Sequence, residues 1–263
     1  MLLFAEHLPS AMRFDVITLF PELFAPFLSS GVTRRAYESG QVLVRLWNPR
    51  DYSEGNYRRV DDRPFGGGPG MVMMAEPLAL CLEAIRADRA ASEATPAPVV
   101  LFSPIGQTLN HSAVEGWAAS GGVVLVCGRY EGVDQRFIDA HVDCQISLGD
   151  FVLSGGEIAA MALIDAVTRL QPGVLNDEGS HQFDSFNPAL DGLLDCPYYT
   201  RPETWRGLAV PAQMLSGHHA DIERWRREQR LALTLARRPE LLQEARAAGR
   251  LTARDEAFLA SQP

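Results

Sequence analysis

Two glycine-rich segments in the middle of the chain could bind a small molecule through their backbone. The first is CGRYEG at residues 127–132, where Arg129 and Glu131 add charge, and the second is SLGDFVLSGGE at residues 147–157. Glycines after a strand let a ligand approach closely and leave N–H and C=O groups available to it. A tight turn between strand and helix is the competing explanation for the first segment. The second is too apolar for a turn alone, so together they predict one pocket.

A third segment, LFSPIGQ at residues 101–107, also follows an apolar run and contains proline and glycine. Ligands of open α/β sheets bind where the carboxyl ends of strands meet, so the three segments predict a shared pocket at one sheet edge. Neither glycine segment has the GxGxxG spacing of a dinucleotide site. All 24 basic residues are arginine, which excludes a P-loop lysine and a Schiff-base lysine.

Charged residues downstream of these segments could carry acid–base chemistry. Asp165 and Arg169 stand four positions apart on a predicted helix, where a local ion pair is the simpler explanation. Asp184 lies in a polar stretch rich in glycine and proline, and a carboxylate on a loop that closes over a pocket is suited to general-base catalysis. Aspartates in such stretches more often form turns, so the pattern alone leaves the role of Asp184 open.

The elements that must position these residues alternate between strands and helices. Apolar runs predict strands at residues 13–20, 41–47, 98–104, 123–127 and 145–148. Periodic patterns predict helices at residues 21–30, 32–39, 76–91, 112–120, 133–140 and 156–170. This alternation predicts an α/β fold with a mostly parallel sheet and helices on both faces.

The pattern changes on either side of this region, residues 12–172. Residues 173–192 lack periodicity and are predicted as an interdomain linker. Residues 193–263 are predicted as a small all-helical C-terminal domain, which contains an arginine-rich amphipathic segment at 220–248. Residues 1–11 are interpreted as an N-terminal extension or a mis-assigned start, with Met12 as the alternative start.

Composition narrows the class of protein. No apolar run approaches the length of a membrane span, and the four cysteines form no CxxC pair, so we expect a protein of the reduced cytoplasm with no disulfide or metal framework. The net charge of −9 argues against a generally basic nucleic-acid binder. Local basic clusters are present at residues 56–71 and after residue 211. Two explanations stay open for each cluster, a solvated surface and a site that binds phosphates.

Ten stretches of the chain resemble the bacterial tRNA (guanine-N1)-methyltransferases of the TrmD type, members of the SPOUT superfamily. They occur in order and span nearly all of residues 13 to about 238. They are ITLFPELF, GVTRRA, VDDRPFGGGPGMVMM, FSPIGQ, LVCGRYEGVDQR, SLGDFVLSGGE, IDAVTRLQPGVL, DSF, GLLDCPYYTRPETWRG and VPAQMLSGHHADIERWR.

The resemblance implies a deep trefoil knot in the sheet domain, which binds S-adenosylmethionine in a bent shape. The pocket residues that it implies are Ser103, Pro104, Gly128, Tyr130, Glu131, Leu148, Gly149, Asp150, Phe151, Val152, Leu153, Gly155 and Gly156. It implies that Asp184 removes the proton from guanine N1, and that Arg169 stabilises the negative charge that spreads onto guanine O6.

The resemblance also implies the partners of the protein. The substrate is tRNA with a guanosine immediately 3′ of the anticodon, and the enzyme is a homodimer whose active site lies at the subunit interface. Magnesium is associated with the family's reaction, but the sequence offers no ligand set for it. Phe151 stands where many relatives have tyrosine, and Tyr198 where histidine is frequent. Two alternatives stay open, a knotted methyltransferase for another RNA nucleoside and an RNA-binding module without turnover.

Overall fold

The computed structural model describes residues 11–175 and 181–262. The predicted N-terminal extension and the question of the start codon therefore fall outside the described residues, apart from Ala11. The chain divides into two compact units, residues 1–175 and residues 176–263. Each unit has its own core and is described separately.

The first unit is built on a five-stranded parallel sheet with the order β2-β1-β6-β5-β7. Its strands are β1 (Met12–Ile17), β2 (Val42–Trp47), β5 (Val99–Thr108), β6 (Gly122–Val126) and β7 (Cys144–Ser147). They overlap the five predicted strands, and the predicted parallel α/β sheet is confirmed. The short antiparallel pair of β3 (Asp61–Asp62) and β4 (Val72–Met73) was not predicted, because two-residue strands carry no periodic pattern.

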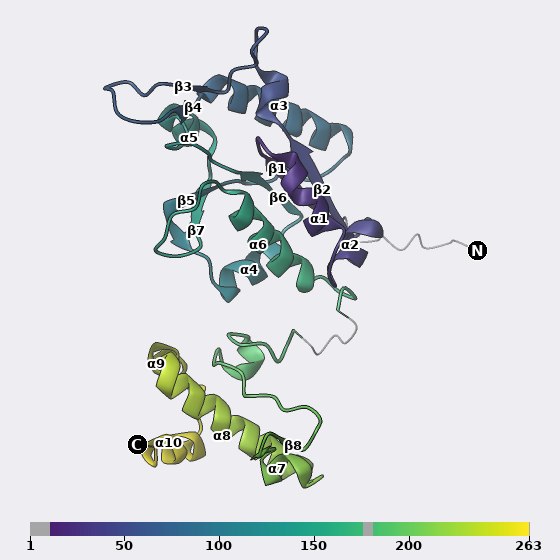
Figure 1. The fold of residues 1–263 in the computed structure, drawn as a ribbon, viewed down its shortest axis with the longest axis vertical. Coiled ribbons are helices and arrows are strands. Elements are labelled where there is room, and N and C mark those ends of the chain that lie inside the picture. The colour runs from purple at the N-terminus through teal and green to yellow at the C-terminus, as the bar shows by residue number, and fades with distance from the viewer. Residues whose placement is uncertain (1–10, 176–180, 263) are drawn as a thin grey trace, which may run out of the picture. The chain divides into compact units, whose positions relative to one another are not determined.

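Helices cover both faces of this sheet (Figure 1). One face is covered by α3 (Ala75–Ala91) and α5 (Gln135–His141), and the other by α1 (Phe24–Leu28), α2 (Arg34–Glu38), α4 (His111–Ala118) and α6 (Glu157–Arg169). Single 3-10 turns η1 (Pro21–Leu23) and η2 (Pro49–Tyr52) complete the connections. Along β6, Val123 and Leu125 belong to the core beneath α6, whereas Val124 and Val126 belong to the core beneath α3. Alternation of this kind follows from the period of two of a strand buried on both faces.

Strand β5 is longer than the sequence predicts, and it is interrupted. Phe102 and Gln107 both pair with Ile146 of β7, so the residues between them bulge out of the ladder. A side chain at Gly106 would place its Cβ 2.5 Å from the backbone of Gln145 and Ile146. The glycine of LFSPIGQ therefore allows β5 to return to β7 after the bulge.

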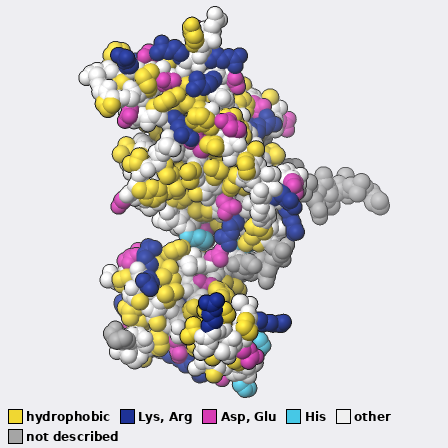
Figure 2. Space-filling model, in the orientation of Figure 1, with side chains coloured by type: hydrophobic (Ala, Val, Ile, Leu, Met, Phe, Trp, Pro, Cys, Tyr) yellow, Lys and Arg dark blue, Asp and Glu magenta, His cyan; other side chains and the backbone are white. Residues whose placement is uncertain are grey.

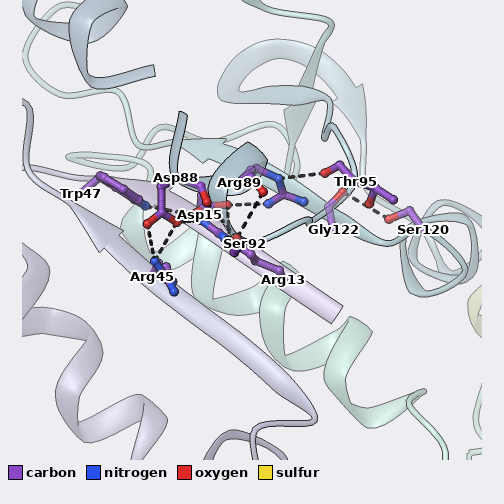
Figure 3. Close-up of polar contacts among 10 residues, drawn as sticks. All are labelled: Arg13, Asp15, Arg45, Trp47, Asp88, Arg89, Ser92, Thr95, Ser120 and Gly122. Carbon is purple, nitrogen blue, oxygen red and sulfur yellow. Dashed lines mark hydrogen bonds and ion pairs between the residues drawn. The ribbon is translucent and has the colours of Figure 1, made fainter. Parts of the chain in front are cut away.

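Two charged residues of β1 are buried on the face covered by α3. Arg13 and Asp15 are 3% and 0% exposed. The carboxylate of Asp15 accepts hydrogen bonds from Arg13 Nη2 at 2.7 Å, Arg89 Nη1 at 2.5 Å and Trp47 Nε1 at 2.9 Å (Figure 3). Asp88 accepts from Arg13 and from Arg45, both at 2.6 Å, and so continues the contacts toward the surface. We call these six residues the Asp15 network; it ties β1 and β2 to α3.

The second unit packs four helices, α7 (Ala212–Leu215), α8 (His219–Arg237), α9 (Pro239–Ala247) and α10 (Ala253–Ala260), in its described part. The core contains Leu193, Leu231, Leu242 and Ala245. The amphipathic segment 220–248 forms two helices, α8 and α9. Pro239 is the first residue of α9, and α8 ends before it because proline cannot continue a helix. At the start of α10, Thr252 and Asp255 form a capping box.

Part of this unit is not helical, which corrects the expectation of an all-helical domain. The strands β8 (Thr204–Trp205) and β9 (Leu208–Ala209) form an antiparallel hairpin. Both residues of its loop, Arg206 and Gly207, have positive φ, as a type I′ turn requires. The usual residues of such a turn are Asn-Gly or Asp-Gly. Here only the glycine is present, because an arginine takes the first position.

The region expected as a linker also has structure where it is described. Residues 181–192 contain a 3-10 helix, η3 (Pro188–Leu190), and the Phe186 N–H donates to the carbonyl of Leu193. Asn187 is buried and binds the His181 carbonyl through its side-chain amide. No helix among the described residues is long and apolar enough to cross a membrane.

Candidate active site

The carboxyl ends of β5, β6 and β7 enclose a cavity of about 390 Å³ in the first unit. Its lining includes eleven residues that the sequence resemblance implies, Ser103, Pro104, Gly128, Tyr130, Glu131, Leu148, Phe151, Val152, Leu153, Gly155 and Gly156. Gly149 and Asp150 belong to the same loop but do not line the cavity. The structure thus brings three distant segments to one sheet edge, and their role in ligand binding stays a prediction.

Glycines bring two of these loops into direct contact. The Gly156 N–H donates to the Gly128 carbonyl at 3.0 Å, and a Cβ on Gly156 would lie 2.8 Å from Cys127 Cα. A Cβ on Gly155 would overlap the side chain of Arg129, at 2.5 Å from its Cδ. Gly156 is therefore required for loop-to-loop packing, whereas a side chain at position 155 would have to displace Arg129.

The first loop, residues 128–132, is also held from its other side. The Glu131 N–H donates to Met71 O at 2.9 Å, and the Met73 N–H donates to Gly132 O at 2.9 Å. Tyr130, which lines the cavity, has a φ of +60°, a left-handed conformation that is uncommon outside glycine. The segment that contains β4 thereby fixes the aromatic residue of CGRYEG.

Burial raises the pKa of Tyr130, and the neighbouring carboxylate of Asp61 raises it further. The phenol therefore stays protonated at neutral pH and can donate or accept a hydrogen bond. Its side chain is 45% exposed, and the residue lines the cavity. Stacking or hydrogen bonding, but not base catalysis, is the chemistry open to Tyr130.

A buried ion pair beneath the two loops was not predicted. Arg129 Nε donates to Glu157 Oε1 at 3.1 Å, Arg129 Nη2 lies 2.8 Å from Glu157 Oε2, and Arg129 Nη1 donates to the Ser154 carbonyl at 3.1 Å. Thr18 Oγ1 donates to Glu157 Oε1 at 2.9 Å. We call Arg129 and Glu157 the loop pair. The only signal in the sequence is an acidic residue in the first turn of α6, where the helix dipole favours it.

Neither predicted catalytic residue lines the cavity. Arg169 is the last residue of α6, and Asp184 belongs to the second unit. The Asp184 N–H donates to His181 O at 3.4 Å, and the Asn187 N–H donates to Asp184 O at 3.2 Å, so Asp184 sits in a hydrogen-bonded turn. Asp165, the alternative partner for Arg169 by spacing, accepts a hydrogen bond from Thr33 Oγ1 at 3.3 Å.

Fold and cavity define the class: an α/β protein with a cavity at the carboxyl edge of a parallel sheet. Comparison with known proteins identifies the family within this class. The model of the family described as tRNA (Guanine-1)-methyltransferase TrmD matches residues 12–244. The chain belongs to this family of enzymes, and the resemblance stated from sequence motifs is confirmed.

Individual relatives match over nearly the whole chain. The tRNA (guanine-N(1)-)-methyltransferase of Polaromonas sp. is 79% identical over 95% of this chain and 96% of its own length. The protein of the same name from Paracidovorax citrulli is 76% identical over 95% of this chain and 98% of its own length. That from Bordetella pertussis is 58% identical over 95% and 97%.

Proposed function

We propose that the protein transfers a methyl group from S-adenosylmethionine to N1 of the guanosine immediately 3′ of the anticodon in tRNA. Membership of the family over residues 12–244 carries the proposal, and the cavity is formed by segments that lie within that match. Asp184 and Arg169 are the proposed catalytic residues. The two alternatives, another RNA nucleoside and binding without turnover, are outcomes of the experiment below.

The cavity suits an adenosyl ligand. Its volume of about 390 Å³ lies in the range of small-molecule sites, and its walls combine apolar side chains with backbone groups of the loops. The loops approach each other so closely that Cβ atoms on Gly155 and Gly156 would collide with their neighbours. Leu148, Phe151 and Leu153 are proposed to contact the adenine ring, and Tyr130 and Glu131 the polar part of the ligand. S-adenosylmethionine supplies a methyl group already activated by its sulfonium.

Asp184 is proposed to accept the proton of guanine N1, which is a poor nucleophile while protonated. The guanidinium of Arg169 is proposed to donate to guanine O6, where negative charge develops as the proton leaves. One well-placed donor of this kind contributes about 3–4 kcal/mol. The hydrogen-bonded turn of residues 181–187 supports the proposal, since it gives the Asp184 backbone a defined position.

The finer features of the architecture belong to the same proposal. We propose that the sheet unit contains a trefoil knot, that residues 12–172 bind the donor, that residues 173–192 link the units, and that residues 193–263 bind tRNA. A homodimer with the active site at the interface is supported by hydrophobic side chains that gather on the face of the sheet unit carrying α6 (Figure 2). Exposed apolar residues of this unit include Phe20, Leu23, Val32, Ile105, Val152 and Ile158.

The tRNA phosphates are proposed to bind exposed arginines, among them Arg58 and Arg59 beside the exposed ring of Tyr57. Placed arginines of this kind reconcile an acidic protein with an anionic substrate. No protein ligands are assigned to magnesium: among the described residues, no group of three or more His, Cys, Asp or Glu side chains comes together. Because the proposed substrate is tRNA, we propose that the protein acts in the cytoplasm.

The proposal is tested with radiolabelled S-adenosylmethionine and two tRNA transcripts that differ only in the nucleotide 3′ of the anticodon, guanosine or adenosine. We expect labelling of the guanosine transcript alone, with the label recovered as 1-methylguanosine after nuclease digestion. Equal labelling of both transcripts would contradict the substrate, and recovery of another methylated nucleoside would favour the first alternative. Donor binding without any labelling would favour the second.

Asp184→Asn tests the general base. We expect it to bind the donor like the wild type and to lose at least a hundredfold in single-turnover rate, since a general base contributes about 10²–10⁴-fold. Asp191→Asn, in the same segment, is a control for changes in that loop. Full activity of Asp184→Asn would assign the base elsewhere.

A further inference from the structure

Arg129 lines the cavity, and its guanidinium is held by neighbouring protein groups. All three guanidinium nitrogens face protein groups: Nε and Nη2 face the carboxylate of Glu157, and Nη1 faces the Ser154 carbonyl. The guanidinium carbon also lies 4.5 Å from the centre of the Phe20 ring. Arg129 thus connects the first loop to the second through all three of its guanidinium nitrogens.

Glu157 is the residue that holds the Arg129 side chain in this position. Its side chain is 1% exposed, and it is not among the residues that line the cavity. Oε1 accepts from both Arg129 and Thr18, whereas Oε2, at 2.8 Å from Arg129 Nη2, has no partner at hydrogen-bonding geometry. The buried carboxylate depends on the part-buried guanidinium of Arg129, because without it Glu157 would be an uncompensated buried charge.

The loop pair connects the elements that form the cavity. Arg129 follows β6, Thr18 follows β1, and Glu157 begins α6 directly after the second loop. The Arg129–Gly155 bridge and the Gly156–Gly128 hydrogen bond set the spacing of the loops, and the ion pair lies directly behind them. Backbone groups recognise a ligand only when their positions are fixed beforehand, so the spacing of these loops governs affinity.

We propose that Glu157 is a positioning residue for the adenosyl ligand. Acting through Arg129, it holds the two glycine loops at the separation that the ligand requires, without touching the ligand itself. This inference rests on the proposed function and adds to it a residue that determines affinity from outside the cavity. It predicts that loss of the loop pair weakens binding of the methyl donor and of its demethylated product equally, because both carry the same adenosyl group.

The test is titration calorimetry of S-adenosylmethionine and S-adenosylhomocysteine with full-length wild type, Glu157→Gln and Arg136→Gln. Glu157→Gln keeps the acceptor for Thr18 and removes the charge that holds Arg129; we expect Kd to rise about tenfold for both ligands. The rate constant at saturating donor and tRNA should stay within about threefold of wild type. Arg136→Gln breaks the exposed pair with Asp134 nearby and should leave both Kd values unchanged.

Two further variants separate positioning from folding. Thr18→Val changes the volume little and removes the hydrogen bond to Glu157 together with the one that Thr18 Oγ1 accepts from the Phe20 N–H, and we expect a rise in Kd of about threefold. The double variant Arg129→Met with Glu157→Gln leaves no uncompensated charge, so thermal stability should recover relative to Glu157→Gln while Kd stays raised. Stability and affinity then respond differently, which a purely structural role of the pair does not allow.

Each remaining outcome overturns one specific statement. If the wild type binds neither ligand, the proposed function fails, whatever Glu157 does. If folded Glu157→Gln binds within twofold of wild type, or if the double variant regains both stability and affinity, Glu157 supports only the fold. If its Kd is unchanged while the rate falls tenfold or more, Glu157 acts in the chemistry. If only the cationic donor binds more weakly, the role of Glu157 is electrostatic.

Discussion

The sheet unit buries two arginine–carboxylate clusters of similar chemistry in different places. In the Asp15 network, a carboxylate that is 0% exposed joins strands β1 and β2 to helix α3. In the loop pair, the almost equally buried Glu157 joins the loops that follow β6 and β7. The first cluster connects elements whose apolar side chains share a core, whereas the second connects two loops that line the cavity. Buried ion pairs therefore have to be judged by what they connect.

A glycine presses against an arginine in each cluster, and the two contacts differ. A Cβ on Gly122 would lie 2.7 Å from Arg89 Nη2 and would also collide with the backbone carbonyl of Arg13. A Cβ on Gly155 would meet only the side chain of Arg129 among its nearest atoms. Backbone in a sheet cannot yield, whereas an arginine side chain can. We therefore expect disruption of the Asp15 network to affect stability and disruption of the loop pair to affect binding.

Asp15→Asn is expected to have the largest effect. It leaves the buried guanidinium groups of Arg13 and Arg89 with too little compensating charge, and removal of one partner from a buried pair costs about 3–5 kcal/mol of unfolding free energy. Urea denaturation measures this loss, and calorimetry at low temperature measures ligand affinity of the folded fraction, which should be unchanged. A tenfold loss of affinity in Asp15→Asn would show that the two clusters are not independent.

Gly122→Ala and Gly155→Ala compare the clusters directly. Gly122 has a φ of +148° and faces backbone, so alanine there should cost about 1–3 kcal/mol or more. Gly155→Ala should cost less stability but displace Arg129, and raise the Kd for S-adenosylhomocysteine about tenfold. Denaturation and calorimetry on both variants measure the two quantities. Equal loss of stability in both, with no change in Kd for Gly155→Ala, would remove the proposed difference.

Acid should weaken the Asp15 network from its outer end. Burial alone would raise the pKa of Asp88, but hydrogen bonds and charge from Arg13 and Arg45 lower it below its usual 3.8. A lowered pKa in the folded state means that Asp88 stabilises the protein fully above pH 3.8 and progressively less as the pH falls through the folded value. The difference in unfolding free energy between wild type and Asp88→Asn should therefore be largest above pH 4 and shrink below it. A difference that grows on acidification would contradict this assignment.

Arg45→Gln should have the smallest effect. Arg45 contacts Asp88 at 2.6 Å, but its side chain is 45% exposed, and solvent screens the interaction. Exposed pairs contribute about 0.2–1 kcal/mol, so we expect a loss at the lower end of that range, measured by urea denaturation and reduced further in 0.5 M salt. A loss close to that of Asp15→Asn would mean that the outer arginine is as important as the buried carboxylate.

Much of the sheet unit could be predicted from local patterns. Successive side chains of residues 123–127 belong alternately to two cores, and helix α6 has an apolar stripe. A few consecutive residues are therefore enough to predict whether such a segment is a strand or a helix. The hairpin of β8 and β9 could not be predicted, because each strand has two residues and its turn has arginine at a positive φ. Likewise, nothing in residues 98–104 indicates that β5 continues past a bulge to pair again with β7.

The candidate site divides in the same way. Segments 101–107, 127–132 and 147–157 could be predicted to share a pocket, since each follows a strand of one parallel sheet. The loop pair could not, because Arg129 and Glu157 are 28 positions apart and charge alone does not indicate which arginine meets which carboxylate. The roles of Asp184 and Arg169 come from the family resemblance and stay predictions.

The sequence by itself determined the order of the elements of the sheet unit, the parallel sheet and the motifs by which the chain belongs to its family. Those properties depend on local periodicity and on residue types that are read directly. The tertiary structure decided that Gly155 and Gly156 serve loop packing, and that Arg129 is paired with Glu157. Such outcomes depend on which segments are brought within a few ångströms, and that proximity is set by the packing of the whole sheet unit.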